Sequence, residues 1–328
     1  MSKKILITGG AGFVGRRLVK VMLDKKYNVV VVDNISPLTG GIDPEKNWPL
    51  YSPKDYQNFT FYKKDCRKWF EENPHEKFDY VFHLAAMVGG REIIENKPLI
   101  VAEDLSIDSH FWQWCANSNP KKVICFSSSA CYPIDLQRQE SHRLLKEDDI
   151  SFENYIGIPD LTYGWAKLTC EYLARIAHKK NGINSICYRP FSGYGEDQDL
   201  SYPFPSICKR VLNNKGNNII NVWGSGKQLR DFIYIDDCIN GVIKTMDKIN
   251  DGSAINLSTG ELTSFIDFTA QTCAILGFNP EIRGIESKPE GVFARGGDTE
   301  KQQKFGFKYD TKLIDGIKKT INYLSNNS

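Results

Sequence analysis

The order strand, glycine-rich turn, helix, strand at the start of the chain restricts the fold more than any other feature. Residues 3–8 form a short apolar run with β-branched side chains, which predicts a buried strand. The glycine run 9–15 follows at once, and residues 16–23 continue with helical periodicity. A second apolar run, 29–33, ends in a carboxylate. The chain therefore begins with a strand–helix–strand unit joined by a tight turn.

The glycine-rich turn predicts a dinucleotide site. A helix N-terminus offers unpaired N–H groups and a positive dipole end to a phosphate, and Gly9, Gly12 and Gly15 leave room for it. Asp33 follows at about the twenty-residue distance of an acid that binds a ribose hydroxyl, and a carboxylate there favours NAD over NADP. A turn that needs glycine only for packing is the alternative. We expect Arg16, at the helix start, to be solvated or close to the pyrophosphate.

Strands and helices alternate through the N-terminal half of the chain. Further strands are predicted at 59–63, 80–84, 122–126 and 183–188, and long helices at 99–116 and 163–179. This alternation predicts an α/β fold with a doubly wound parallel sheet, whose ligands lie beyond the carboxyl ends of the strands. We expect 34–58 to be a long loop that can include one short helix, and 135–160 to be another loop. Beyond residue 189 the alternation weakens, which is typical of a smaller mixed lobe.

The composition excludes several classes of protein. The net charge of +2 over 328 residues gives no electrostatic reason to expect nucleic acid or a membrane surface as a partner. No apolar run approaches the length of a membrane span, and we expect no signal peptide. The nine cysteines are odd in number and scattered without a C-x-x-C pair, so neither a disulfide framework nor a metal site is predicted. We expect a cytoplasmic protein.

A tyrosine and a lysine on one predicted helix carry the chemistry. Tyr163 and Lys167 are four residues apart, which places them on one helix face. The ammonium favours the phenolate, so the phenol can take a proton from a carbinol while hydride leaves the carbon. Ser129, in the serine run after the 122–126 strand, would hydrogen-bond the same substrate oxygen. A surface pair is the alternative, but the nucleotide-binding start and the serine run favour catalysis.

These motifs together are similar to a known family. The matching positions are 8–15, Asp33, Asp65, 83–86, 127–129, Tyr163, Lys167, 189–190, 223–226, 230–237, 289–295 and Asp298. The chain thus resembles the extended short-chain dehydrogenase/reductases, the NAD-dependent epimerase/dehydratase family acting on nucleotide sugars. The resemblance implies a Rossmann NAD-binding domain over 1–190, and a nucleotide-sugar lobe over 191–328 from which about 228–260 returns to the sheet. It also implies a homodimer formed through the two long helices.

The resemblance assigns ligand contacts to individual positions. NAD would be held by Gly9, Gly12, Phe13, Val14, Gly15, Asp33, Asn34, Asp65, Cys66, Leu84, Ala85, Ala86, Ser127, Tyr163, Lys167 and Arg189. The sugar nucleotide would be held by Val88, Gly89, Ser129, Cys131, Trp223, Arg230 and Arg295. The two arginines are the candidates for the diphosphate, because guanidinium groups match phosphate oxygens.

The choice of reaction depends mainly on residues that are missing. The acids of the 4,6-dehydratases are absent, since 129–131 reads Ser-Ala-Cys. Val88-Gly89-Gly90 is similar to GDP-fucose synthase, and 128–133 is similar to GDP-mannose 3,5-epimerase. The second acid/base of the 3,5-epimerases is missing, so we interpret Cys131 as part of the sugar-pocket wall. We therefore expect oxidation at C4 of a GDP-hexose or GDP-heptose to a 4-keto sugar, with a 4-epimerase as the alternative. A 3,5-epimerase and a non-catalytic dinucleotide-binding protein are further alternatives.

Overall fold

The computed structural model describes residues 2–288 and 290–327, so Pro289 of the 289–295 motif lies outside the described residues. The chain forms two compact units. The first contains residues 1–131, 159–189 and 242–255, and the second contains 132–158, 190–241 and 256–328. The chain therefore passes between the units several times.

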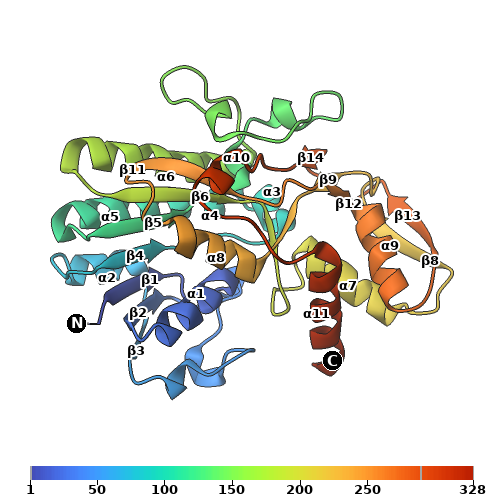
Figure 1. The fold of residues 1–328 in the computed structure, drawn as a ribbon, viewed down its shortest axis with the longest axis horizontal. Helices are drawn as coiled ribbons and strands as arrows, with labels where there is room; N and C mark the ends of the chain where they lie inside the picture. The colour runs from blue at the N-terminus through green and yellow to red at the C-terminus, as the bar shows by residue number, and fades with distance from the viewer. Residues whose placement is uncertain (1, 289, 328) are drawn as a thin grey trace. The chain divides into compact units, whose positions relative to one another are not determined.

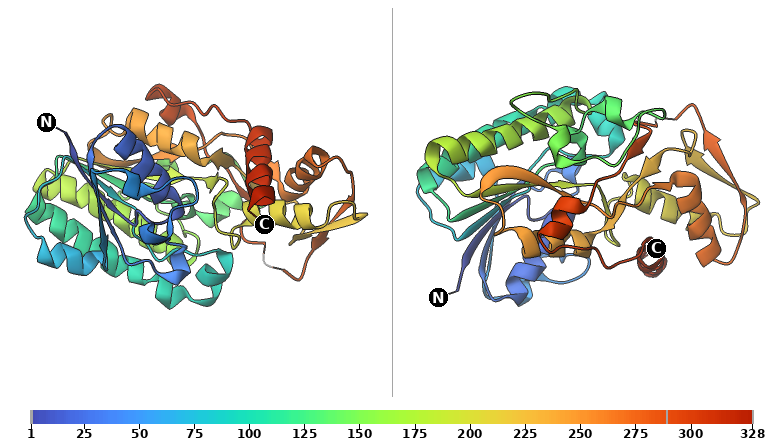
Figure 2. Two further views of the ribbon diagram at one scale, coloured as in Figure 1. Left: turned by 90° about the horizontal axis from the view of Figure 1, so that it is seen from below. Right: turned by 45° about the horizontal axis from the view of Figure 1, so that its top comes forward.

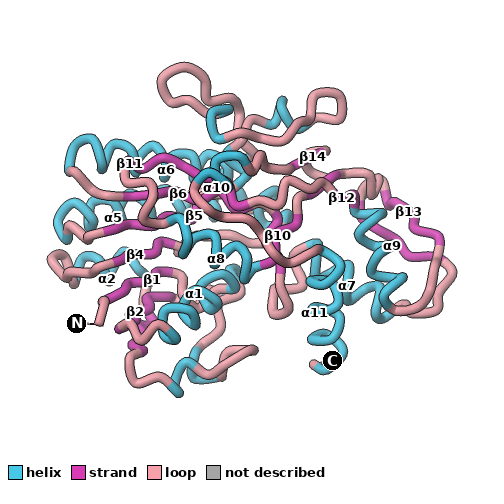
Figure 3. The backbone as a smooth tube through the Cα atoms, viewed as in Figure 1, coloured by secondary structure: helices cyan, strands magenta, loops and turns pink. Residues whose placement is uncertain are grey.

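The first unit is built on a seven-stranded sheet with the strand order β11-β6-β5-β4-β1-β2-β3. Its strands are β1 (Lys4–Thr8), β2 (Asn28–Asp33), β3 (Phe59–Lys63), β4 (Tyr80–His83), β5 (Lys122–Phe126), β6 (Ser185–Pro190) and β11 (Asp251–Leu257). All neighbours from β3 to β6 pair in parallel. Figure 1 labels these strands, and Figure 3 draws them in magenta, side by side. The predicted doubly wound parallel sheet is confirmed.

Helices cover both faces of this sheet. They are α1 (Phe13–Asp24), α2 (Cys66–Glu72), α3 (Arg91–Asn96), α4 (Pro98–Val101), α5 (Glu103–Ser118) and α6 (Leu161–Asn181). Side chains of α2, α5 and α6 share one apolar cluster with β1, β2, β4, β5 and β6. Helix α1 lies on the opposite face (Figure 2, dark blue). The near-continuous apolar strands are explained, because each strand is buried on both faces.

The predicted elements agree with the structure except in two places. The predicted helix 99–116 is divided at Ala102 into α4 and α5. The predicted loop 34–58 contains three 3₁₀ turns, η1 (Pro37–Thr39), η2 (Pro44–Lys46) and η3 (Pro53–Asp55), where we expected room for one short helix. Each turn begins with a proline, whose fixed φ suits the first position of a helical turn.

The second unit contains short strands and four helices among the described residues. The helices are α7 (Pro203–Asn213), α9 (Phe265–Ile275), α10 (Glu300–Lys304) and α11 (Leu313–Asn326), while α8 (Ile235–Thr245) is shared with the first unit. Three small sheets pair β7 (Ser192–Tyr194) with β10 (Phe232–Tyr234), β8 (Ile219–Trp223) with β13 (Glu281–Ile285), and β9 (Leu229–Arg230) with β12 (Thr263–Ser264) and β14 (Ala294–Arg295). The predicted smaller mixed lobe is present. Short 3₁₀ turns complete the chain at η4 (Ser129–Cys131), η5 (Ile134–Gln137) and η6 (Glu147–Asp149).

The division into units differs in detail from the predicted domain boundary at 190. Residues 132–158 belong by their contacts to the second unit, although they precede that boundary. The segment that returns to the first unit is 242–255, which is shorter than the expected 228–260. Lys122 anchors this segment, because its ammonium donates to Asn250 Oδ1 at 2.7 Å and to the Ile249 carbonyl. The assignment of a ligand to each unit remains a prediction.

Candidate active site

The glycines of the first turn have different reasons to be glycine. Gly9 has a φ of 71°, and a Cβ there would lie 2.6 Å from the Ala85 nitrogen. A Cβ on Gly15 would lie 2.4 Å from the Gly9 oxygen. Gly12, the N-cap of α1, has a φ of −72° that any residue adopts, and its Cβ would meet only the Gly9 oxygen at 3.4 Å. Packing therefore requires Gly9 and Gly15, whereas Gly12 keeps the helix N-terminus open, as a pyrophosphate needs.

Asp33 is tied to this turn by hydrogen bonds. Its carboxylate accepts the Ala11 N–H at 3.0 Å and the Ile35 N–H at 2.8 Å. Arg16 donates to the Ala11 carbonyl at 2.8 Å and is 2% exposed. Arg16 is therefore not solvated, because its side chain folds back over the turn, and the alternative position close to the pyrophosphate remains a prediction. Burial raises the pKa of Asp33, and the two N–H groups and the Arg16 charge oppose that shift.

The other predicted cofactor residues surround the same strand ends. Leu84, Ala85 and Ala86 follow β4 and are half-buried. Asp65 caps α2 by accepting the Arg67 N–H. The Arg67 guanidinium also donates to the Asp65 carboxylate at 2.6 Å, which lowers the pKa of the carboxyl. The remaining predicted residues are Phe13 and Val14, half-buried in the first turn of α1; Asn34, exposed; and Cys66, buried at the start of α2. These residues follow the carboxyl ends of β1, β2, β3 and β4, and their contacts with NAD remain predictions.

The start of α6 packs closely on the loop after β5. The Asp160 N–H donates to the Ala130 carbonyl at 2.9 Å, and Arg91 donates to the Asp160 carboxylate at 2.8 Å. A Cβ on Gly164 would lie 2.4 Å from the Ala130 oxygen, so only glycine permits this approach. Gly164 directly follows Tyr163 in the sequence. The contact therefore brings the tyrosine against the serine run.

Tyr163 and Lys167 lie together on α6, as the spacing predicted. The Lys167 Nζ is 5.7 Å from the centre of the Tyr163 ring. Burial raises the pKa of Tyr163, while the charge of Lys167 and a hydrogen bond with Ser128 lower it. The ammonium acts in the expected direction, but burial outweighs it. Sequence reasoning missed Ser128 as the hydroxyl beside Tyr163; Ser129, in η4, is 5% exposed, and its substrate contact remains a prediction.

Three predicted ligand-binding residues instead form a buried structural cluster. Arg189 and Glu171, each 1% exposed, are joined by two hydrogen bonds, of 2.9 Å from Nε and 2.6 Å from Nη2. Ser127 donates to Glu171 at 2.5 Å, and its oxygen lies 3.1 Å from the Cys131 sulfur. Cys131 has no exposed surface, and burial raises the pKa of its thiol. These bonds occupy the Arg189 guanidinium and the Ser127 hydroxyl, while the contacts of Arg189 and Ser127 with NAD and of Cys131 with the sugar remain predictions.

Val88 and Gly89 lie in the loop between β4 and α3. Val88 is half-buried, and Gly89 is buried. A Cβ on Gly89 would lie 2.4 Å from the Ile93 side chain. Packing therefore explains this glycine without a ligand.

The two arginines predicted to hold a diphosphate are neighbours in the second unit. Arg230 and Arg295 stand opposite each other in the parallel pair β9 and β14. Paired residues of adjacent strands share one face of a sheet, so both guanidinium groups leave from the same face. Gln137, which is fully buried, accepts from Arg295 Nε at 2.7 Å. Trp223 is 46% exposed, with Lys288 5.5 Å from its ring.

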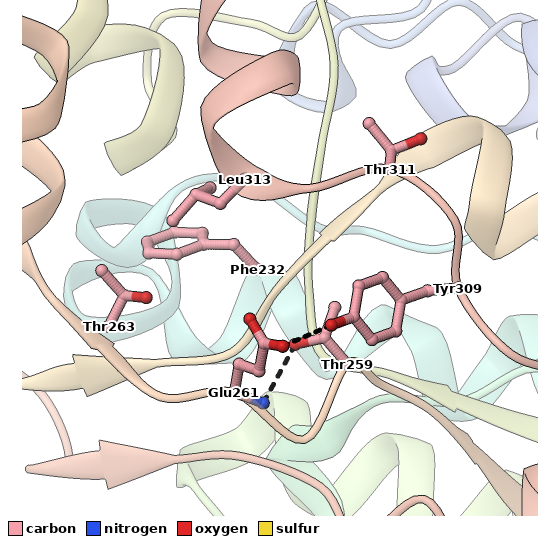
Figure 4. Close-up of a pocket in the computed structure, with 7 residues that line it drawn as sticks. All are labelled: Phe232, Thr259, Glu261, Thr263, Tyr309, Thr311 and Leu313. Atoms are coloured by element: carbon pink, nitrogen blue, oxygen red, sulfur yellow. Dashed lines mark hydrogen bonds between the residues drawn. The ribbon is translucent and has the colours of Figure 1, made fainter.

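A small pocket of the second unit contains none of the predicted site residues. Tyr309 donates to Glu261, and the Glu261 N–H donates to Thr259 Oγ1 at 3.1 Å (Figure 4). Thr259 also donates to the buried carboxylate of Asp231 at 2.7 Å. This pocket therefore belongs to the scaffold around Asp231. No cluster of three or more potential metal ligands exists within residues 2–288 and 290–327. Over the same described ranges, no helix has the length and apolarity that a membrane crossing requires.

Comparison with known proteins is consistent with this geometry. The model of the NAD dependent epimerase/dehydratase family matches residues 5–258. An uncharacterized UDP-glucose epimerase, YtcB of Bacillus subtilis, is 30% identical, and the match covers 98% of both chains. GDP-L-colitose synthase of Yersinia pseudotuberculosis is 24% identical over 98% of both chains. The structure of UDP-glucuronic acid 4-epimerase from Bacillus cereus with UDP-glucuronic acid and NAD superposes with a TM-score of 0.80 at 26% identity, covering 99% of this chain and all of that one.

The fold and the residues around the glycine turn define an NAD-dependent enzyme with a Rossmann domain. The chain belongs to the NAD-dependent epimerase/dehydratase family of extended short-chain dehydrogenase/reductases. The resemblance inferred from the sequence motifs is confirmed. Two features of the site fit NAD. The open N-terminus of α1 at Gly12 suits the pyrophosphate, and the carboxylate of Asp33 suits a ribose hydroxyl.

Proposed function

We propose that this enzyme is a nucleotide-sugar 4-epimerase in which Tyr163 is the acid/base. One observation carries the proposal: the Lys167 ammonium lies 5.7 Å from the ring of Tyr163, at the point where α6 packs on the loop after β5. A phenol whose phenolate is stabilised by a neighbouring ammonium can exchange a proton with a sugar hydroxyl.

The protein groups would act in sequence on the C4 hydroxyl of the sugar. Tyr163 takes the hydroxyl proton, and Lys167 stabilises the phenolate that receives it. Bound NAD supplies a hydride acceptor. Ser129 donates a hydrogen bond to the oxygen that becomes a carbonyl. When the ketone presents its other face and C4 regains the hydride there, Tyr163 returns the proton to that oxygen, and the product is the C4 epimer.

The comparisons support an epimerase over a dehydrogenase that releases its ketone. The relatives of known structure include a UDP-glucuronic acid 4-epimerase at 26% identity. The features that favoured GDP-sugars have structural explanations, because Gly89 is required by Ile93 and Cys131 is buried. GDP-sugar oxidation at C4 is the second candidate, and the similarity to GDP-L-colitose synthase supports the GDP part of it. Arg230 and Arg295 suit the diphosphate of either nucleotide sugar.

The reaction is tested on a panel of GDP-, UDP-, CDP- and dTDP-sugars. The purified protein is first denatured to identify the nucleotide that it releases, which we expect to be NAD. The native protein is then incubated with each sugar and followed by proton NMR. A 4-epimer supports the proposal, an accumulating 4-ketone supports the second candidate, and the absence of both products overturns both. Deuterium that appears at C3 or C5 of the sugar would indicate that Cys131 acts as an acid/base.

Assembly and location are part of the same proposal. Trp165 and Tyr172, seven residues apart on α6, are both 47% exposed, and Leu105 on α5 is 43% exposed. Since α5 and α6 pack side by side, these apolar groups suit a second copy of the chain in a homodimer. Trp165→Glu is expected to give a monomer in light-scattering chromatography, and Lys179→Glu at the end of the helix leaves a dimer; an unchanged mass for Trp165→Glu contradicts the interface.

Nine free cysteines are consistent with a reducing cytoplasm.

A further inference from the structure

Two buried carboxylates act electrostatically on Lys167, and the proposed reaction leaves their role open. Asp104 and Asp108 lie one turn apart on α5, and each is 1% exposed. Lys167, on the neighbouring helix α6, is 4% exposed. Buried charges are costly unless they are compensated, so three such residues on facing helices form one electrostatic cluster. This cluster adjoins Tyr163 through Lys167.

The two carboxylates are held by different partners. Asp108 Oδ1 lies 3.1 Å from His83 Nε2, and His83 Nδ1 lies 2.8 Å from Thr8 Oγ1. Asp104 Oδ1 accepts the Met87 N–H at 2.5 Å. The Oδ2 atoms of both residues have no hydrogen-bond partner in the part of the chain that the structure describes. Each carboxylate is therefore anchored by one oxygen, and its remaining compensation comes from the charge of Lys167.

The titratable groups around this cluster come from four elements, α5, α6, η4 and β4. From α5, Glu103 and Asp108 act on Asp104; from α6, Cys170 and Tyr163 act on Lys167; and Cys131 of η4 acts on Tyr163. His83 of β4 also faces Lys167, and burial lowers the pKa of that imidazole. Burial raises the pKa of both thiols, so neither carries charge near neutral pH. The ionised neighbours are therefore the carboxylates and the ammonium.

We propose that Asp104 is a positioning residue that sets the ionisation of Tyr163 by offsetting the charge of Lys167. The inference rests on the proposed function, in which Tyr163 is the acid/base. Lys167 lowers the pKa of Tyr163, and the negative charge of Asp104 raises it. Burial raises the pKa of Asp104 to about 6, while Lys167 opposes that shift and Asp108 adds to it. Protonation of Asp104 thus removes one of the two negative charges that offset the ammonium, and it makes the phenol a stronger acid.

The test measures the phenol directly. The protein is loaded with NAD, whose oxidised nicotinamide also favours the phenolate, and carries tyrosine labelled with ¹³C at Cζ. The Tyr163 signal is assigned by its absence from Tyr163→Phe, and its midpoint is followed against pH. Asp104→Asn keeps the oxygen that accepts the Met87 N–H and removes the charge. We expect its Tyr163 midpoint to fall by roughly one pH unit.

Two further measurements make the test decisive. The control Glu103→Gln removes an exposed carboxylate next to Asp104 on the same helix and is expected to leave the midpoint unchanged. In the unmutated protein, the Tyr163 signal should show a small step near pH 6, where Asp104 takes up a proton. An unchanged midpoint in Asp104→Asn overturns the proposal, and if that variant does not fold, a missing step does so.

This test is independent of the sugar panel. The titration uses no sugar, so a shifted midpoint without any epimer or ketone would leave the positioning role standing and remove the proposed reaction. Turnover of a sugar with an unchanged midpoint would support the proposed reaction and overturn the positioning role of Asp104. Once a substrate is known, the limb of the pH–rate profile that reports Tyr163 should move to lower pH in Asp104→Asn by the same amount.

Discussion

Helix α6 carries two buried charge clusters four residues apart, and they are built on opposite principles. The Glu171 carboxylate accepts three hydrogen bonds, two from Arg189 and one from Ser127. We call these three residues the saturated cluster, because the buried charge is fully hydrogen-bonded. Lys167 lies instead near Asp104 and Asp108, each of which keeps one oxygen without a partner among the described residues. Both clusters are equally buried. They differ in how completely their charges are matched by hydrogen bonds.

This difference separates structure from chemistry within one helix. A saturated ion pair has one low-energy arrangement and one protonation state, so it can fix the position of β6 against α6 but cannot exchange protons. An incompletely matched cluster responds to the gain or loss of a proton. The tyrosine that contacts Lys167 can therefore be tuned, while Cys131, beside the saturated cluster, remains a neutral thiol.

The largest effect is expected at the phenol of Tyr163, which lies beside Lys167. Tyr163→Phe should lower the rate of hydride transfer by about 10²–10⁴-fold, because the proton acceptor is lost. The NAD released on denaturation should remain equimolar with protein. Single turnover by NMR and the released nucleotide measure the two quantities. Tyr172→Phe, a half-exposed tyrosine on the same helix, is the matched control. A Tyr163→Phe enzyme with unreduced turnover would remove Tyr163 as the base.

The next effect is a loss of stability at the saturated cluster. Arg189→Met leaves the Glu171 charge buried without its main partner, which should lower the free energy of unfolding by about 3–5 kcal/mol. Urea unfolding measures the change. The double variant with Glu171→Leu should recover much of the loss, since no unpaired charge remains. A cost below about 1 kcal/mol for Arg189→Met would show that the pair is not the rigid element described above.

The buried carboxyl of Asp104 should make the folded protein less stable as the pH rises. The pKa of Asp104 is raised from 3.8 to about 6 in the folded protein, so ionisation of this group costs stability as the pH rises through that interval. Asp104→Asn cannot ionise and should be more stable than the unmutated protein at pH 8, by up to about 3 kcal/mol. The difference should fall to roughly half at pH 5 and vanish below the unfolded pKa. Urea unfolding at pH 8 and pH 5 measures it, and a pH-independent difference would contradict the assignment.

The smallest effect is expected at Cys131. Because its thiol is buried and protonated, Cys131→Ala should change turnover by no more than about twofold and cost about 1 kcal/mol of stability. All nine cysteines are buried, so N-ethylmaleimide should label the native protein slowly and label nine thiols after unfolding. Rapid inactivation by the reagent, absent in Cys131→Ala, would show that this thiol is accessible.

Local patterns in the sequence were sufficient for the elements and for the cofactor turn. The strands 59–63 and 122–126 have their predicted bounds, and Gly9, Gly12 and Gly15 join β1 to α1 as expected. The spacing of Tyr163 and Lys167 predicted one helix face, which is where they lie. These features depend on residues close together in the chain, whose geometry follows from the helix and strand periods.

Tertiary structure decided which side chains are available. Arg189 had the position of a cofactor ligand in the sequence, but Glu171, on another element, binds it. Arg230 and Arg295 are distant in sequence, and only the pairing of β9 with β14 makes them neighbours. The burial that isolates Asp104 beside Lys167 also arises from the packing of α5 on α6. The sequence by itself thus determined the fold, the cofactor turn and the tyrosine–lysine pair; contacts between distant segments determined which charges are matched, because ion pairing and burial depend on neighbours that no local period specifies.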